Sequence, residues 1–261
     1  MTSLNLKYGD DLYHKYTKYC KLISENYTHF ENFKKHPSYT YMLEHVTYEY
    51  GKKYINLLKT EYRDILQQLN WVEIHKHDRI GSPNLYDYSN ELKPVVILST
   101  YMFSPTTFRY LYIALDILSK NKGNNIKSVV EIGGGYGGQA LLLLLIAPLF
   151  EINIRYYTII DVYYPTLVQK KYLRKFNVTY NVVCTTINKY NIGDVDLLIS
   201  NYALSEIQRE YQNSYIPLVQ LALHGYMLWN RKFIMPCVIS KKPMIVDEVT
   251  KTTFRNKLIY F

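Results

Sequence analysis

The chain has 261 residues, of which 48% are hydrophobic and 20% are charged, so it is neither a disordered chain nor a small scaffold held together by disulfides. Its three cysteines, Cys20, Cys184 and Cys237, are scattered and form no CxxC pair, so the sequence predicts neither a disulfide framework nor a zinc ribbon and fits a reducing compartment. The formal net charge of +9 would suit a polyanion, but no run of Lys and Arg is longer than two residues. The 29 tyrosines, beside many Asn, Ile and Lys residues, are typical of A/T-rich codons. We therefore do not expect a nucleic-acid partner.

The first residues contain no apolar signal core, and the longest apolar run is residues 140–150. A membrane-spanning helix needs about 20 apolar residues. We therefore expect a cytoplasmic protein with no membrane span, and the sequence leaves a homo-oligomer open.

The N-terminal part has a helical pattern. In residues 10–33 and 39–70, apolar and tyrosine positions recur at spacings of three and four, which predicts two or more amphipathic helices separated near residues 36–38. Residues 73–91 contain Gly, Pro, Asn, Asp and Ser, which predicts a loop or a short irregular element. We expect residues 1–92 to form a helical extension that acts as a lid or substrate platform, and residues 93–261 to form a second domain.

From residue 125 onwards, short β-branched runs alternate with helix-length segments. Strands separated by helices imply right-handed crossovers and a mostly parallel, doubly wound sheet, that is, a Rossmann-like α/β fold. The last two strands have no full helix between them, only residues 241–255, so they should add an antiparallel edge. The predicted strands are residues 127–133, 155–161, 180–185, 195–201, 225–229, 233–239 and 256–261; the predicted helices are residues 139–150, 165–176 and one between residues 201 and 225.

The sharpest motif is the run Val-Glu-Ile-Gly-Gly-Gly-Tyr-Gly-Gly at residues 130–138, between a predicted strand and a predicted helix. Gly133, Gly135 and Gly138 match the GxGxxG pattern of dinucleotide-binding enzymes. Glu131, Gly133, Gly135 and Gly137 also match ExGxGxG, which resembles motif I of the class I S-adenosylmethionine-dependent methyltransferases. An acid would repel a pyrophosphate but suits the ammonium and sulfonium of S-adenosylmethionine. The motif therefore favours S-adenosyl-L-methionine as the cofactor, and a dehydrogenase remains the alternative.

Other candidate cofactor residues follow the next strands. Asp161 could accept both ribose hydroxyls, with Val162 beside the adenine, although Asp161 could instead cap a helix. Ser200 and Asn201 end a buried strand, at the sheet edge where open α/β folds bind ligands. The Asn/Asp-Pro-Pro-Tyr signature of amino-methylating enzymes is not found there, which argues against a base amine as the acceptor.

The chain also resembles the sugar O-methyltransferases of the class I group. The resemblance implies a seven-stranded Rossmann-like sheet whose last strand is antiparallel, and methyl transfer to a sugar hydroxyl on a glycan or a nucleotide sugar. It rests on residues 81–83 (Gly-Ser-Pro), 103–110 (Phe-Ser-Pro-Thr-Thr-Phe-Arg-Tyr), 131–138, 160–161 and 200–206 (Ser-Asn-Tyr-Ala-Leu-Ser-Glu). A nucleic-acid methyltransferase and an inactive binding module with the same fold are the alternatives.

Transfer to an alcohol needs a base. We predict Glu206 as that base, with partial burial raising its pKa, and Asp78 as a second candidate; the alternatives are a helix-start carboxylate and a turn cap. Arg109 could bind the methionine carboxylate or form a structural salt bridge. Histidines at positions 75 and 77 are poor evidence for a metal, so we predict no catalytic metal. The remaining candidates are cofactor residues Tyr101 and Tyr136 and substrate residues Tyr202, Asn230 and His77, each with a structural alternative.

Overall fold

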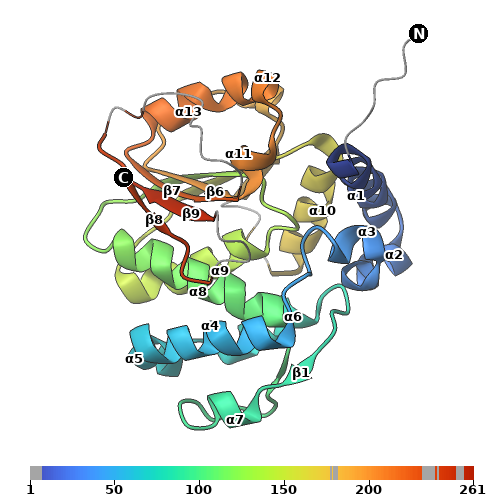
Figure 1. Ribbon diagram of the computed structural model, residues 1–261, viewed down its shortest axis with the longest axis vertical. Coiled ribbons are helices and arrows are strands. Elements are labelled where there is room, and N and C mark those ends of the chain that lie inside the picture. Colours follow the sequence, from blue (N-terminus) through green and yellow to red (C-terminus); the bar gives the residue numbers. More distant parts are fainter. Residues whose placement is uncertain (1–7, 177, 179–181, 231–238, 240, 251–255) are drawn as a thin grey trace. The chain divides into compact units, whose positions relative to one another are not determined.

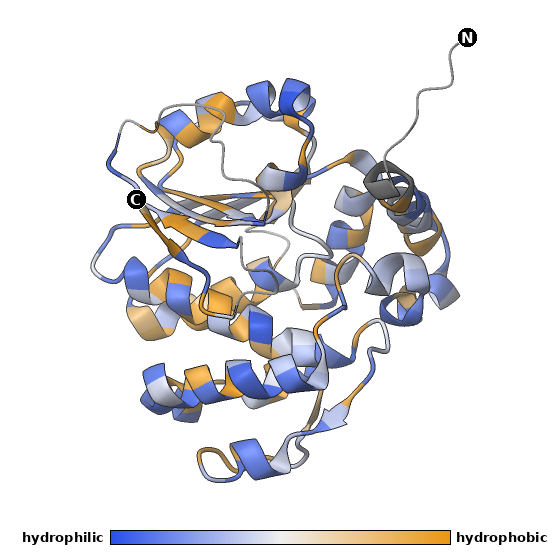
Figure 2. Cartoon of the chain, in the orientation of Figure 1, coloured by the Kyte–Doolittle hydropathy of each residue, from blue (hydrophilic) through white to orange (hydrophobic). Residues whose placement is uncertain are grey.

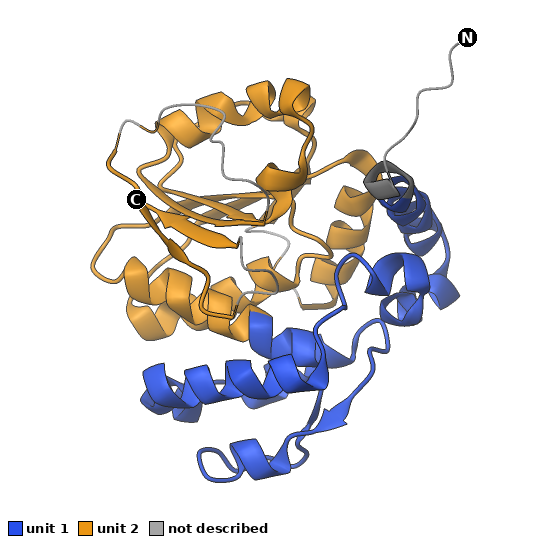
Figure 3. Ribbon diagram, in the orientation of Figure 1, with its two compact units in different colours: residues 1–109 blue, residues 110–261 orange. Residues whose placement is uncertain are grey.

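The computed structural model describes residues 8–176, 178, 182–230, 239, 241–250 and 256–261 (Figure 1). The chain divides into two compact units, residues 1–109 and residues 110–261 (Figure 3). The proposed change of domain after residue 92 stays a prediction.

Unit 1 is mainly helical, so the helices predicted from the amphipathic pattern of its sequence are confirmed. Local caps set several helix starts: Asn26 Oδ1 accepts a hydrogen bond from the backbone N–H of His29, and Thr47 Oγ1 accepts one from that of Tyr50. Its elements are α1 (Tyr8–Glu25), α2 (Tyr27–Glu31), η1 (Phe33–Lys35), α3 (Pro37–Thr40), α4 (Tyr48–Glu61), α5 (Arg63–Gln68), α6 (Trp71–Arg79), β1 (Tyr86–Asp87), α7 (Ser89–Leu92), β2 (Met102–Phe103) and the start of α8 (Pro105–Lys120).

The loop predicted for residues 73–91 is wrong over its first part, because α6 occupies Trp71–Arg79. Asn70 caps this helix through a hydrogen bond from the Glu73 backbone N–H. Two of the side chains that α6 buries, His77 and Asp78, are polar. A helix with polar residues on its buried face lacks the apolar stripe on which the sequence argument relied.

Unit 2 contains a seven-stranded sheet in the order β5-β4-β3-β6-β7-β9-β8. The strands from β5 to β7 pair in parallel, whereas β9 lies between β7 and β8 and is antiparallel to both. The predicted doubly wound sheet with an antiparallel last strand is therefore confirmed. Its strands are β3 (Ser128–Ile132), β4 (Tyr156–Ile160), β5 (Val182–Thr185), β6 (Leu197–Asn201), β7 (His224–Trp229), β8 (Met244–Asp247) and β9 (Lys257–Tyr260).

One strand was misplaced by the sequence argument. β8 falls within residues 241–255, which we expected to be a connection, and all four of its residues are exposed. The strand carries three consecutive apolar residues, but it is short, shows no alternation of apolar and polar residues, and lies in a stretch rich in Lys, Asp and Thr that indicates a connection. Most of the predicted strand at residues 233–239 lies outside the described residues.

Helices flank this sheet and bury its apolar side chains. The predicted helix over residues 139–150 is α9, which is buried along almost its whole length, followed by η2. One core cluster joins Val130, Ile160, Leu198 and Met227 from four neighbouring strands, and Figure 2 shows the sheet as mainly hydrophobic. The helical elements are α9 (Gly138–Ile146), η2 (Ala147–Phe150), α10 (Tyr163–Leu173), η3 (Arg174–Phe176), η4 (Ile187–Lys189), α11 (Ala203–Glu206), α12 (Arg209–Gln212), η5 (Asn213–Tyr215) and α13 (Ile216–Leu221).

The strand register places the candidate residues of unit 2 along one edge. Ile132 pairs with Ile160, and Asn201 pairs with Leu228, so β3, β4, β6 and β7 end at the same level. Ligands of open α/β sheets bind outside such carboxyl ends. In the part of the chain that the structure describes, none of the helices has the length and hydropathy needed to span a bilayer.

Candidate functional site

The glycine loop joins β3 to α9 in a conformation that its glycines permit. Gly133, Gly135 and Gly137 have φ angles of +73°, +56° and +94°, which L-residues with a side chain rarely adopt. A Cβ on Gly133 would overlap with the Cβ of Ala203, and a Cβ on Gly134 would overlap with the Ile159 side chain. These glycines therefore allow close packing within the protein as well as the sharp turn.

Glu131 comes from β3, directly before the loop, and is 1% exposed. Its carboxyl group accepts a hydrogen bond of 3.0 Å from the Tyr157 hydroxyl. Burial is the main cause that raises the pKa of Glu131 to about 8; the hydrogen bond from Tyr157 opposes this shift, and the nearby Asp161 contributes to it. A cation beside this group would favour its ionised form.

Asp161 follows β4 at the same edge. Its Oδ1 accepts a hydrogen bond of 2.8 Å from the Val162 backbone N–H, and its Oδ2 accepts one of 2.9 Å from Gln169 Nε2. Burial raises the pKa of Asp161 to about 7 despite these hydrogen bonds. The N-cap residue of α10 is Val162, not Asp161, and Val162 is exposed.

The candidate residues at the end of β6 differ in their burial and in their hydrogen-bond partners. Ser200 is buried, and its hydroxyl accepts a hydrogen bond from the Leu204 N–H, which fixes the start of α11. Asn201 Oδ1 is buried and has no hydrogen-bond partner among the described residues. Tyr202 has a φ of +67° and donates a hydrogen bond to Glu248, a buried acid after β8.

Glu206, the first predicted base, lies on α11 and is exposed, so the partial burial expected for it is wrong. Its position at the end of a four-residue helix leaves the carboxylate outside the core. Asn230 donates a hydrogen bond of 2.6 Å from Nδ2 to Glu206 Oε1 and accepts one of 2.8 Å from the Ser205 hydroxyl. The structure thus brings Glu206, which follows β6, into contact with Asn230, which follows β7.

Tyr136 lies in the loop, but its ring is 1% exposed and packs edge-on against Tyr172 at 4.9 Å. It also lies near Tyr110, with ring centroids 5.9 Å apart. The Tyr136 side chain therefore contributes to the core of unit 2.

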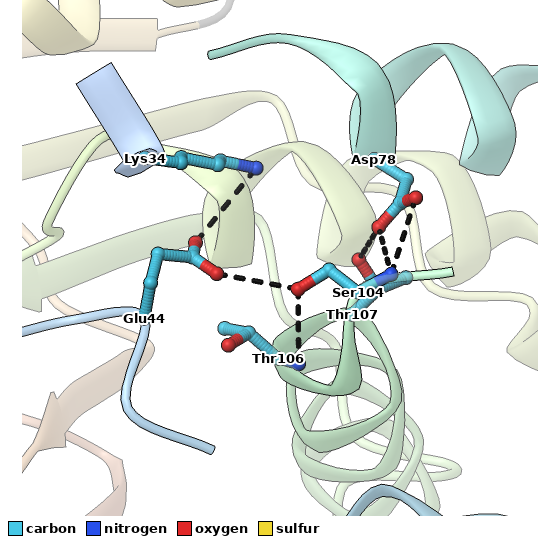
Figure 4. A network of polar contacts seen from close by, with 6 residues as sticks. All are labelled: Lys34, Glu44, Asp78, Ser104, Thr106 and Thr107. Atoms are coloured by element: carbon cyan, nitrogen blue, oxygen red, sulfur yellow. Dashed lines mark hydrogen bonds and ion pairs between the residues drawn. The ribbon is translucent and has the colours of Figure 1, made fainter. Parts of the chain in front are cut away.

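Asp78, the second predicted base, lies in unit 1 and is fully buried (Figure 4). Its carboxylate accepts hydrogen bonds from the Ser104 backbone N–H at 3.1 Å and from the Thr107 hydroxyl at 2.5 Å. Ser104 also donates to Glu44 at 3.3 Å, and Lys34 lies 3.8 Å from the other Glu44 oxygen. Burial raises the pKa of Asp78 to about 6, although Lys34 opposes the shift.

Three other candidates also belong to unit 1. His77 is fully buried, and burial followed by the charge of Lys34 holds its pKa well below the usual value. Arg109 is 7% exposed; burial raises the pKa of the Glu44 carboxyl, and the charges of Lys34 and Arg109 oppose that shift. Tyr101 closes its own loop, because its hydroxyl accepts from the Leu98 N–H and donates to a backbone carbonyl. Among the described residues, no group of three or more His, Cys, Asp and Glu side chains is placed to hold a metal ion.

Gln169, Glu248 and the Lys34–Glu44 pair were not predicted from the sequence. Gln169 lies eight residues after Asp161, and helical spacing alone does not identify its partner. Glu248 and Tyr202 are 46 residues apart, so only the sheet order brings them together.

No protein-family model and no curated protein matches the chain. Among solved structures, it is similar to the mitomycin 7-O-methyltransferase MmcR, at 13% identity over 54% of this chain and 40% of that chain, with a TM-score of 0.38. It is also similar to PigF with SAH (12% identity, 59% and 55% covered, TM-score 0.42) and to a SAM-dependent methyltransferase from Aquifex aeolicus (14% identity, 56% and 87% covered, TM-score 0.41). The chain spans about half the length of the first structures that it matches, namely 54%, 40% and 48%. At these identities and TM-scores, the comparison assigns no activity.

Proposed function

We propose that this chain is an S-adenosylmethionine-dependent O-methyltransferase that acts on a sugar hydroxyl, in a glycan or a nucleotide sugar. The observation that carries the proposal is the glycine loop with the buried Glu131 and the partly buried Asp161 beside it, all at the carboxyl ends of β3 and β4. Once ionised, these two carboxyl groups attract a cationic ligand and repel a pyrophosphate, which supports this cofactor over a dinucleotide.

The residues present fit this cofactor. Asn201 Oδ1 is a buried acceptor with no partner among the described residues, so it is available to a ligand N–H or O–H. In the proposed arrangement, Glu131 balances the positive charge, Asp161 accepts the ribose hydroxyls, and Val162 lies beside the adenine. S-adenosylmethionine supplies an electrophilic methyl group when it is bound.

Two carboxylates are proposed as the base that takes the proton of the acceptor hydroxyl. Glu206 is exposed, and Asn230 fixes one of its oxygens, so it can meet a substrate from solvent. Asp78, the other candidate, belongs to unit 1 and is fully buried there, with its carboxylate bonded to Ser104 and Thr107, so we place Glu206 first. Tyr202 and Asn230 are proposed to orient the sugar at the ends of β6 and β7.

The first test is calorimetric binding of S-adenosylmethionine, S-adenosylhomocysteine and NAD. We expect micromolar binding of the first two and a loss of at least about 30-fold in affinity in Asp161→Ala, because buried polar ligand groups lose their acceptor. Asp247→Ala is the control: it removes an exposed aspartate of the edge strand β8 that pairs with Lys257 on the neighbouring strand β9. Binding of NAD alone would instead support the dinucleotide alternative.

The second test concerns the base. We expect Glu206→Gln to lower kcat for a methyl-accepting sugar by at least about 100-fold, because a positioned base contributes that much, while S-adenosylhomocysteine binding stays unchanged. The matched control is Glu210→Gln, an exposed glutamate on the neighbouring helix α12. Unchanged turnover in Glu206→Gln would remove this residue as the base and leave Asp78→Asn as the next variant to measure.

A further inference from the structure

Gln169 connects two parts of the candidate site that come from different segments. It lies on α10 and is fully buried. Its Nε2 donates hydrogen bonds to the Gly135 carbonyl at 3.1 Å and to Asp161 Oδ2 at 2.9 Å. One amide nitrogen therefore ties the glycine loop to the carboxylate that follows β4.

The orientation of this amide follows from its neighbours. A carbonyl oxygen and a carboxylate oxygen can only accept hydrogen bonds, so the nitrogen of Gln169 must face both of them. The carbonyl oxygen Oε1 then points elsewhere and has no partner among the described residues. Leaving a buried acceptor without a partner costs folding free energy, and the two bonds of Nε2 hold the amide in this orientation despite that cost.

The two hydrogen bonds also have an electrostatic consequence. A donor at 2.9 Å favours the ionised form of Asp161 and opposes the effect of burial on its pKa. The second Asp161 oxygen is held by the backbone N–H of Val162, so the carboxylate is fixed at both ends. A fixed, ionised carboxylate is the form that can accept hydrogen bonds from two hydroxyl groups.

We propose that Gln169 is a positioning residue that holds Asp161 and the glycine loop in register for the ribose of a nucleoside ligand. The inference rests on the proposed function for the identity of that ligand. Its geometric part needs only a nucleoside with two ribose hydroxyls.

The test compares Gln169→Met with the wild-type protein by calorimetry of S-adenosylhomocysteine between about pH 5 and 9. Met has a similar length but no donor. We expect affinity at pH 7 to fall about tenfold and the pH at half-maximal affinity to rise by about one unit, because Asp161 loses the donor that favours its charge. A loss of packing alone would lower affinity equally at every pH.

The other groups that face Asp161 remain in the variant, so a moved midpoint reports Gln169. Glu131 faces it from β3, Cys184 from β5 and Tyr215 from η5. The matched control is Gln139→Met on α9, because Gln139 is also buried and donates one bond of 3.3 Å to the Tyr110 carbonyl. We expect this control to keep the wild-type midpoint.

A second variant covers the case in which Gln169→Met does not fold. Gln169→Glu keeps the shape but sets an oxygen against Asp161, and it should raise the midpoint further. Wild-type affinity and midpoint in a folded Gln169 variant would overturn the proposal. Failure of the wild-type protein to bind S-adenosylhomocysteine would instead reject the proposed cofactor, and the same variants would then be measured with NAD.

Discussion

Gly133→Ala should lower the free energy of unfolding by about 3 kcal/mol or more. A residue with a side chain loses about 1–2 kcal/mol at a positive φ, and the new Cβ would overlap with the Cβ of Ala203 in a packed region. The measurement is urea denaturation at constant pH. Binding of S-adenosylhomocysteine should fall as well, because the loop must move.

Two other glycines separate these two causes. Gly123 has a φ of +85°, but a Cβ at this position would have nothing within 4 Å, so Gly123→Ala should cost about 1–2 kcal/mol from backbone strain alone. Gly193 also has open space around it, and its φ lies outside the left-handed range, so Gly193→Ala should be close to neutral. The double variant Gly133→Ala/Ala203→Gly removes the overlapping Cβ of Ala203, so it should recover part of the stability that Gly133→Ala loses. A Gly133→Ala protein as stable as wild type would contradict the close packing.

Asp78→Ala should destabilise the protein by about 3–5 kcal/mol. The change removes the acceptor of the Ser104 N–H and the Thr107 hydroxyl inside unit 1 and leaves the charge of Lys34 less balanced. The control is Asp87→Ala, which removes an exposed carboxylate with one bond of 2.8 Å from the Ser89 N–H and should cost about 1 kcal/mol. Equal losses in the two variants would show that the buried network adds nothing.

The same carboxylate gives stability a pH dependence of known sign. Its pKa rises from 3.8 to about 6 on folding, so the folded protein holds the proton more tightly. Stability from this group is full below about pH 4 and is lost as the pH rises through about 6, by about 3 kcal/mol. Asp78→Asn lacks this loss, so its deficit relative to wild type should be smaller at about pH 7 than at about pH 4.5. If the stability deficit of Asp78→Asn grew with pH instead, the pKa of Asp78 would be lowered on folding, not raised.

The sequence predicted those parts of the fold whose signals are local. β3, the glycine loop and α9 were recognisable because a β-branched run, a glycine cluster and an apolar helix follow one another directly along the chain. The antiparallel last strand followed from the absence of a helix before it. α6 and β8 were missed for opposite reasons: α6 buries polar side chains, whereas β8 exposes apolar ones.

The candidate site was predictable only where a residue directly follows a strand or lies at its end. Glu131, Asp161 and Asn201 satisfy that condition, and the sheet register sets them along one edge. Glu248 and Gln169 do not, because each reaches the site through a contact that forms only when distant segments have folded. The burial of a side chain is equally hidden, which is why Glu206 was expected to be partly buried and Asp78 was placed in a turn.

The position of β9 sets an order of assembly for the sheet. In the described part of the chain, β8 pairs with β9 alone, and β9 pairs with β7, so β8 can join only after the segment that follows it. β8 is also an edge strand whose four residues are all exposed, so few buried contacts hold it in place. β8 and the acid that follows it, Glu248, should therefore be among the first parts of the sheet to open.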